Sequence, residues 1–359
     1  MSEAIKDVVN WLSSPEILFA LSTIFCLFGL KARWLWTNKA GLIGLIGFVV
    51  FFAWSFQDPD FKTIVTKPDN VPIVMLFLFV GFFMWLSLKQ AHENDERIEA
   101  GGEPIEKGEF KEKVLTWPHL VYAELICLVL MTVGLVLWSI LVHAPLEEPA
   151  NPAKTPNPSK APWYFLGLQE MLVYYDPWIA GVVLPTLVIV GLMAIPYIDR
   201  NTKGSGYYTL KERPFAITIF LFGFIVLWVV LIIIGTFLRG PNWNFYGPFE
   251  YWDSHKLEAL VNVNLSEFIF VKWMGTGLPE FWLTREIWGL LIVVAYFVIP
   301  PPLLARTVFK DFYKQLGVAR YSVMVFFFLC MLSLPGKMLL RWFFNLKYIV
   351  AIPEYFFNI

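Results

Sequence analysis

The sequence predicts an all-α membrane protein, a polytopic bundle of about eight transmembrane helices. Of its 359 residues, 57% are hydrophobic and only 16% are charged, whereas a soluble domain is usually about 45–50% apolar and about 25% charged. Helices are expected because backbone polar groups in lipid must be satisfied within the membrane segment itself. The net charge of −1 offers no basic face to nucleic acid.

Eight apolar runs approach or reach the roughly 17–25 residues that a helix needs to cross a bilayer. They are Pro15–Leu30, Ala40–Phe56, Val71–Leu88, Leu120–Val142, Trp178–Ile198, Phe215–Leu238, Ile287–Ala305 and Tyr321–Leu340. The first run is short, and an extension back to Trp11 would lengthen it.

Lys and Arg residues are concentrated in the loops that follow the odd-numbered runs, which hold more than half of the 28 basic residues. Cytoplasmic loops carry an excess of Lys and Arg. We therefore expect these four loops in the cytoplasm and both termini on the outer, periplasmic side. The segment 144–176, between the fourth and fifth runs, is then also outside.

The positions of the ionisable side chains argue against two classes of membrane protein. Transporters usually carry such groups at mid-span, but Glu124 lies only about five residues inside the fourth run. The four histidines, His92, His119, His143 and His255, lie in loops or at the ends of runs. Haem between helices needs inward-facing axial ligands, so we expect no haem and no metal bound by this chain alone.

The segment 144–176 changes abruptly from proline-rich to aromatic. The stretch "APLEEPANPAKTPNPSKAP" cannot form a helix, because each proline lacks an N–H and clashes with the preceding turn. Pro162 suits the first position of a helix, and "WYFLGLQEMLVYY" follows it. As a helix, this second stretch is about 20 Å long, too short to cross. We expect it to lie at the outer interface or against the bundle.

Glu170 is the one acid in this aromatic stretch. At helical spacing it shares a face with Trp163, Leu166, Gly167, Met171 and Tyr174. An ionisable side chain in such a place is expensive to maintain and therefore indicates function. The alternative is that Glu170 simply points to water together with Gln169.

Four motifs resemble the C-terminal half of cytochrome b, most closely the separate small subunit (subunit IV) of split cytochrome b complexes. They are "TWPH" (116–119), "EPANPAKTP" (148–156), "KAPWYF" (160–165) and "KERPFAITIFLFG" (211–223). The resemblance implies three segments. Residues 1–112 form an N-terminal extension with three spans. Residues 113–240 form the cytochrome b core, with the quinol-site loop 144–176. Residues 241–359 form an outer aromatic loop with two further spans.

The resemblance implies a function for the chain as part of a complex. Such complexes oxidise quinol at the outer face, pass one electron to a Rieske iron–sulfur protein and one to a haem b, and release two protons outside. The chain would be a subunit of a quinol:cytochrome c-type oxidoreductase in the bacterial cytoplasmic membrane, not catalytic alone. The implied partners are a haem-bearing N-terminal cytochrome b chain, the Rieske protein, a c-type cytochrome and lipids, in a dimeric complex.

One position departs from the family pattern at the expected quinol-oxidation site. The family's usual motif is Pro-Glu-Trp-Tyr, whereas Ala161 and Pro162 precede the Trp-Tyr pair here. The glutamate thought to take the proton from quinol is therefore missing. The departure also favours a low-potential quinone such as menaquinone.

We hypothesise that Glu170 supplies the missing carboxylate, because a positioned base removes a proton from quinol far more easily than water does. It lies two turns beyond Trp163, about 10 Å along a helix. Tyr164 would line the pocket and offer a hydrogen bond. The predicted quinol-binding residues are Pro162, Trp163, Tyr164, Phe165 and Glu170. A partner chain or Asp176 are the alternative sources of the base.

The resemblance also implies an inner quinone-reduction site. The candidates are His119, Glu124, Asp199, Arg200, Lys211 and Arg213. His119 follows a Trp-Pro pair where the family has an acid, and it could replace that acid. The alternative is that these side chains are ordinary helix-end charges at the lipid headgroups.

A further alternative for the whole chain is a purely structural membrane subunit without a site of its own, and the missing glutamate favours it.

Overall fold

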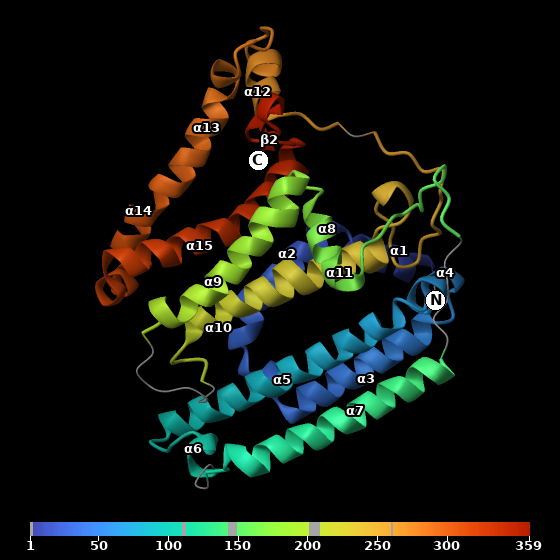
Figure 1. The fold of residues 1–359 in the computed structure, drawn as a ribbon, viewed down its shortest axis with the longest axis vertical. Coiled ribbons are helices and arrows are strands. Elements are labelled where there is room, and N and C mark those ends of the chain that lie inside the picture. The colour runs from blue at the N-terminus through green and yellow to red at the C-terminus, as the bar shows by residue number, and fades with distance from the viewer. Residues whose placement is uncertain (1–2, 110–112, 143–148, 201–208, 260) are drawn as a thin grey trace. The chain divides into compact units, whose positions relative to one another are not determined.

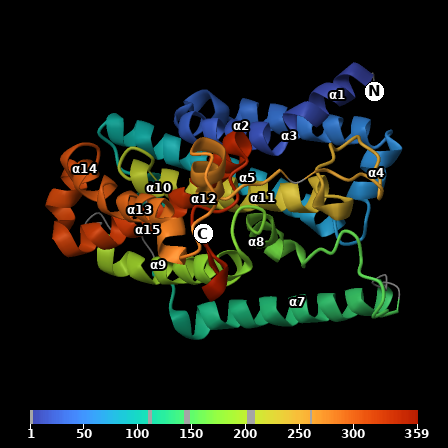
Figure 2. The ribbon, with the colours of Figure 1, turned by 90° about the horizontal axis from the view of Figure 1, so that it is seen from above.

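The computed structural model describes residues 3–109, 113–142, 149–200, 209–259 and 261–359 (Figures 1 and 2). The helices are α1 Glu3–Leu12, α2 Pro15–Phe28, α3 Asn38–Ser55, α4 Pro59–Val65, α5 Val71–Glu99, α6 Ile105–Glu109, α7 Val121–Leu141, α8 Leu166–Met171, α9 Leu184–Ile198, α10 Pro214–Leu221, α11 Val230–Ile233, α12 Leu265–Glu267, α13 Trp282–Val298, α14 Pro300–Arg306 and α15 Lys310–Phe344. Two short strands, β1 Ala351–Ile352 and β2 Phe357–Asn358, pair antiparallel.

The expected all-α polytopic fold is confirmed. In the described part of the chain, seven helical stretches are long and apolar enough to cross a membrane: Asn38–Ser55, Val71–Glu99, Thr116–Leu141, Ile179–Ile198, Pro214–Leu238, Trp282–Arg306 and Lys310–Phe344. An eighth arises if α1 and the helix that begins at Pro15 together form one span. Eight crossings put both termini on one side of the membrane and seven put them on opposite sides, so the predicted orientation depends on this pair.

A sharp bend separates α1 from the helix that follows it. The axes of Glu3–Leu12 and Pro15–Lys31 differ by 70°. Pro15 stands at the first position of α2, where its missing N–H costs no intrahelical hydrogen bond. If the first apolar run extends back to Trp11, the span that it forms is therefore bent.

The chain divides into two compact units. The first comprises Met1–Glu3, Leu27–Pro156 and Gly204–Ile219, and the second comprises Ala4–Cys26, Asn157–Lys203 and Phe220–Ile359. Each unit draws on more than one of the three segments expected from the sequence. The boundaries of those segments stay a prediction.

In the first unit, α3 and α5 lie side by side (Figures 1 and 2), and Gly41 allows their close approach. The indole of Trp85 occupies the space that a side chain at position 41 would need. Its Nε1 donates a hydrogen bond to the carbonyl oxygen of Thr37 at 3.1 Å. The Thr37 hydroxyl in turn accepts from the N–H of Ala40 and caps α3. By contrast, α7 buries none of its side chains.

In the second unit, α14 packs against α15, and α13 contacts α15 but diverges from it beyond α14 (Figure 1). Two tyrosine hydroxyls tie them together: Tyr296 donates to the carbonyl oxygen of Leu329 and Tyr321 to that of Pro301, each at 2.7 Å. Helix α9 also packs against α15. These contacts satisfy polar hydroxyls inside an apolar bundle, where an unpaired one would be costly.

The C-terminal residues fold back onto α13. The N–H of Ala351 donates to the fully buried carboxylate of Glu286 at 3.0 Å. Gly289, one turn further along α13, lies directly against the carbonyl group of Ile349. A Cβ atom at position 289 would overlap that backbone oxygen. The segment 345–359 is therefore held by backbone contacts that require a glycine on α13.

Replacement of Gly289 by alanine is expected to separate the C-terminal segment from α13. Overpacking of this kind typically costs about 1–3 kcal/mol, and the obstructing atom belongs to the backbone, which has little freedom to yield. Thermal unfolding of the purified protein in detergent would measure the loss as a lower midpoint. Gly134→Ala on α7 is the matched control, because nothing lies within 4 Å of a Cβ there. Equal midpoints for the two variants would contradict the packing described.

Candidate functional site

The aromatic part of the segment 144–176 begins with a tight turn and a short helix. Trp163–Phe165 forms the turn, α8 continues it to Met171, and turns follow to Tyr175. The helix expected over the whole of 163–175 is thus shorter than predicted. Neither the turn nor α8 belongs to a membrane-crossing stretch, which agrees with the expectation that this segment does not cross.

The proline-rich approach is tied to α8 by Gln169. Its amide oxygen accepts from the N–H of Ala161 and its amide nitrogen donates to the carbonyl oxygen of Ser159, both at 2.8 Å. Lys160 donates to the carbonyl oxygen of Thr236 at 2.8 Å. The approach is non-helical from 149 to 161, as expected. Residues 144–148 of the predicted quinol-site loop lie outside the described residues.

Helix α8 lies close against the span that ends at Leu238 (Figure 1). A Cβ on Gly167 would be 3.5 Å from the side chains of Trp228 and Ile232, and one on Gly235 would be 3.1 Å from the carbonyl oxygen of Leu166. The two glycines therefore let the short helix approach the span closely. Leu166, Gly167 and Glu170 are buried on this face. Tyr174, beyond the end of α8, is buried as well, so four of the six residues predicted to share a helical face are buried.

Glu170 forms a buried ion pair with Arg239, which follows the last residue of that span. Its carboxylate is fully buried and accepts two hydrogen bonds from the guanidinium, at 2.6 Å from Nη2 and 3.0 Å from Nε. Arg239 also donates through Nη1 to the carbonyl oxygen of Trp243 at 3.0 Å. Two parallel N–H···O bonds are the strongest geometry for such a pair. The alternative that Glu170 points to water is therefore wrong.

This ion pair places a condition on any proton-accepting role of Glu170. Both carboxylate oxygens are engaged by Arg239, so the pair must separate before Glu170 can accept a proton from a substrate. Arg239 is not among the site residues predicted from the sequence. The available signal was its position: a basic residue at the outer end of an apolar run, where basic residues are scarce.

Two buried tyrosines follow α8. The hydroxyl of Tyr175 donates to Ser333 Oγ at 2.8 Å, and the ring of Tyr174 meets that of Trp342 edge-on at 6.1 Å. Burial raises the pKa of the Tyr174 phenol well above its ordinary value, and the nearby Glu170 carboxylate adds to this. Asp176, the alternative base, is only half-buried, and its carboxylate accepts from Asn358 Nδ2 at 3.1 Å.

The aromatic side chains at the start of the segment form an exposed shelf. Tyr164 and Phe165 are 46% and 49% exposed, and their ring centroids lie 4.7 Å apart. Pro162 is exposed and Trp163 is half-buried, and the Trp163 ring lies 6.4 Å from that of Trp228. Four of the five predicted quinol-binding residues are thus contiguous. The fully buried carboxylate of Glu170 does not reach this exposed surface.

The residues predicted for an inner site are divided between the two compact units. Asp199 and Arg200, exposed after α9, belong to one unit, and His119, Glu124, Lys211 and Arg213 belong to the other. Lys211 forms an ion pair with Glu99 of α5. Within the described ranges, no group of three or more His, Cys, Asp or Glu side chains could hold a metal ion.

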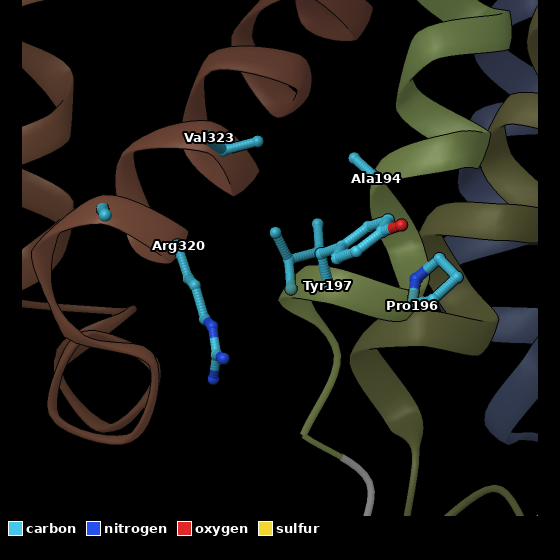
Figure 3. A pocket seen from close by; sticks show the side chains of 7 residues that line it. Ala194, Pro196, Tyr197, Arg320 and Val323 are labelled. Atoms are coloured by element: carbon cyan, nitrogen blue, oxygen red, sulfur yellow. The ribbon is translucent and has the colours of Figure 1, made fainter.

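An open hollow lies between the end of α9 and the start of the apolar part of α15 (Figure 3). Its polar lining comes from Tyr197 and Arg320. The other lining residues are Ala194, Pro196, Ile198, Ala319 and Val323. None of the six predicted inner-site residues lines it.

The aromatic part of the segment 144–176 lies within a match to a known protein family. Residues 149–249 match the family described as Cytochrome b(C-terminal)/b6/petD. The match spans less than a third of the chain and includes the aromatic shelf, α8 and both members of the buried ion pair. The match confirms the resemblance inferred from the motifs over these residues, which are similar to a subunit IV-like cytochrome b C-terminal domain. No solved structure matches the chain.

Breaking the ion pair from either side should destabilise the protein. Glu170→Gln and Arg239→Gln are each expected to lower the free energy of unfolding by about 3–5 kcal/mol, because one buried charge is left without its partner. The double variant should lose about 1–3 kcal/mol less than the sum of the two. Denaturant titration of the four proteins in detergent completes this cycle. Strict additivity would contradict a direct interaction between the two side chains.

The buried tyrosines predict a loss of stability at high pH. Burial raises the pKa of Tyr174 and Tyr175 above the ordinary value of 10.0, so the unfolded chain releases these protons first. The contribution of these two tyrosines to the free energy of unfolding is fully present below about pH 10 and is lost as the pH rises above it. Tyr174→Phe should reduce the slope by up to about 1.4 kcal/mol per pH unit. The measurement is unfolding free energy against pH, and equal slopes in both proteins would contradict it.

Proposed function

We propose that this chain, whose residues 149–249 match the cytochrome b C-terminal family, is a membrane subunit of a cytochrome bc-type complex and forms one wall of its quinol-oxidation site. The family match is the observation that carries this proposal. Two structural features support it. The matched region lies in a multi-pass membrane protein, and it presents exposed aromatic rings on a segment that does not cross the membrane.

The chain's residues suit the binding of a quinol head group. The rings of Tyr164 and Phe165 offer an apolar surface for an aromatic ring, and aromatic pairs stabilise each other beyond their buried area. The Tyr164 hydroxyl can hydrogen-bond a quinol oxygen. Oxidation of the quinol to the quinone releases two electrons and two protons. The electrons pass to groups held by partner chains, and this chain contributes the binding wall and a proton acceptor.

Glu170 is the proposed proton acceptor, with Asp176 and a partner chain as alternatives. For Glu170 to act, binding of the quinol must separate it from Arg239, and the guanidinium would then lie beside the newly negative quinol oxygen. A general base contributes typically 10²–10⁴-fold to a rate. Asp176 needs no such separation, because its carboxylate is bound only by neutral donors among the described residues.

The remaining expectations belong to the same proposal. The haem b would be held by an N-terminal cytochrome b chain, and a Rieske protein would take the first electron. A c-type cytochrome would follow it in a dimeric complex of the bacterial cytoplasmic membrane. The absence of the family's glutamate favours menaquinone. His119, Glu124, Asp199, Arg200, Lys211 and Arg213 remain the candidates for an inner quinone site.

A structural subunit without its own chemistry is the second candidate. Pro162 stands where the family has its glutamate, and the carboxylate of Glu170 is bound by Arg239. Both observations favour a segment that has kept its architecture while a partner carries the reaction.

Quinol oxidation by the purified complex separates these possibilities. If Glu170 is the base, Glu170→Gln should lower turnover by about 10²–10⁴-fold, while Arg239→Gln, which keeps the carboxylate, should retain much more activity. If the pair is only structural, both variants should lose assembly and activity alike. Asp176→Asn tests the alternative base. Full turnover in assembled Glu170→Gln would overturn the role of Glu170.

The aromatic shelf has its own test. Tyr164→Ala should weaken quinol binding and raise KM, because it removes both the exposed ring and the hydroxyl. Tyr197→Ala, an exposed tyrosine at the other end of α9, is the matched control and should leave the outer reaction unchanged. Wild-type kinetics in Tyr164→Ala would favour the structural subunit.

A further inference from the structure

The polar end of α5 holds three different loops through buried side chains. Helix α5 is 29 residues long, about 43 Å, whereas the hydrocarbon core of a bilayer is about 30 Å thick. Its last turns therefore extend beyond the membrane. His92, Asn94 and Asp95 are buried there, although polar side chains at an exposed helix end normally face water. We call these three residues the α5 hub.

Each residue of the hub contacts the backbone of a different segment. The Nε2 atom of His92 lies 3.0 Å from the carbonyl oxygen of Leu30, in the region that follows α2. The side-chain oxygen of Asn94 accepts from the N–H of Ile105, at the start of α6, at 3.0 Å. Asp95 accepts from two consecutive N–H groups, those of Leu210 and Lys211, at 3.2–3.3 Å. By charge, all these segments belong to the cytoplasmic side.

The contact made by Asp95 differs from the other two because it buries a charge. The side chain is 3% exposed, and within the described ranges Asp95 makes no ion pair, so its charge is stabilised by the two amides. An isolated buried carboxylate is very costly, whereas one bound by consecutive backbone N–H groups is well stabilised. The carboxylate and the docked loop therefore depend on each other. Thr209 and Leu210 are themselves buried, which agrees with a firmly held loop.

The loop that Asp95 holds belongs to the cytochrome b C-terminal match, and Asp95 does not. Residues 209–213 lead directly into α10 and lie within 149–249. Asp95 lies in the N-terminal region outside the match. Glu99, one turn further along α5, pairs with Lys211 and Arg33 at the exposed rim of the same contact. Surface ion pairs of this kind contribute little to stability. The buried carboxylate of Asp95 is therefore the main contact that holds the loop on α5.

We propose that α5, the third of the N-terminal spans, serves to fix this inner loop, with Asp95 as the positioning residue. The loop carries Lys211 and Arg213, two candidates for the inner quinone site. The functional part of this inference rests on the inner site of the proposed function. A quinone bound there would meet a loop of fixed position because the α5 hub holds it. Small displacements of positioning groups have large effects on rates.

Hydrogen–deuterium exchange on the intact complex tests the docking directly. In wild-type protein the amides of 210 and 211 should exchange slowly. In Asp95→Ala they should exchange about 10–100-fold faster, because each loses a hydrogen bond to a charged acceptor. Asp95→Asn, whose amide oxygen can still accept, should be intermediate. It also serves as the milder variant if Asp95→Ala does not assemble. Glu99→Gln is the matched control and should exchange at the wild-type rate.

Kinetics at the inner face test the positioning role with the same variants. Re-oxidation of haem b by added quinone, with the outer site blocked, should show a KM for quinone raised about tenfold in Asp95→Ala and partly restored in Asp95→Asn. Unchanged exchange in Asp95→Ala would overturn the docking. Faster exchange with unchanged kinetics would overturn the positioning role. If wild-type complex shows no inner reaction, the inner site of the proposed function and the positioning role both fail, while the exchange result still decides the docking.

Discussion

The buried ion pair between Glu170 and Arg239 is the interaction on which the outer segment depends. Helix α8 has only six residues, and isolated helices shorter than about 12–15 residues are marginal in water. The helix is instead held by its contacts: two glycines let it approach the neighbouring span, and the ion pair closes that contact. Because a lone charge cannot remain in this interior, α8 and the end of the span stay together or the fold opens locally.

A buried carboxylate has a comparable part in the other compact unit, where Asp95 holds the inner loop by two backbone amides. Each carboxylate joins a segment that does not cross the membrane to a helix that does. Apolar packing distinguishes poorly between lipid and protein, since lipid tails are as apolar as leucine. Charged hydrogen bonds with fixed geometry supply the specificity that hydrophobic burial does not. We infer that such contacts determine where the loops of this protein lie.

The chemistry proposed for the outer segment follows from the same constraint. A protein with Pro162 in place of the family's glutamate needs another proton acceptor, and the buried carboxylate of Glu170 is already bound to an arginine. The ion pair either only stabilises the fold or keeps Glu170 inactive as a base until a bound substrate separates Glu170 from Arg239. In both cases the aromatic shelf at Trp163–Phe165 remains accessible, so a ring can bind without disturbing the fold.

The sequence by itself determined the all-α class, the apolar stretches that cross, the short non-crossing helix and the cytochrome b resemblance, because hydropathy, helical period and motifs are local properties. It also singled out Glu170, from one acid on an aromatic face. It did not identify Arg239, 69 residues away, or the contact of Asp95 with amides 115 and 116 residues away. Nor did it end α8 at Met171 or reveal the bend before Pro15. Only the tertiary structure decided these features, because the partner of a buried charge is set by which distant backbone lies beside it.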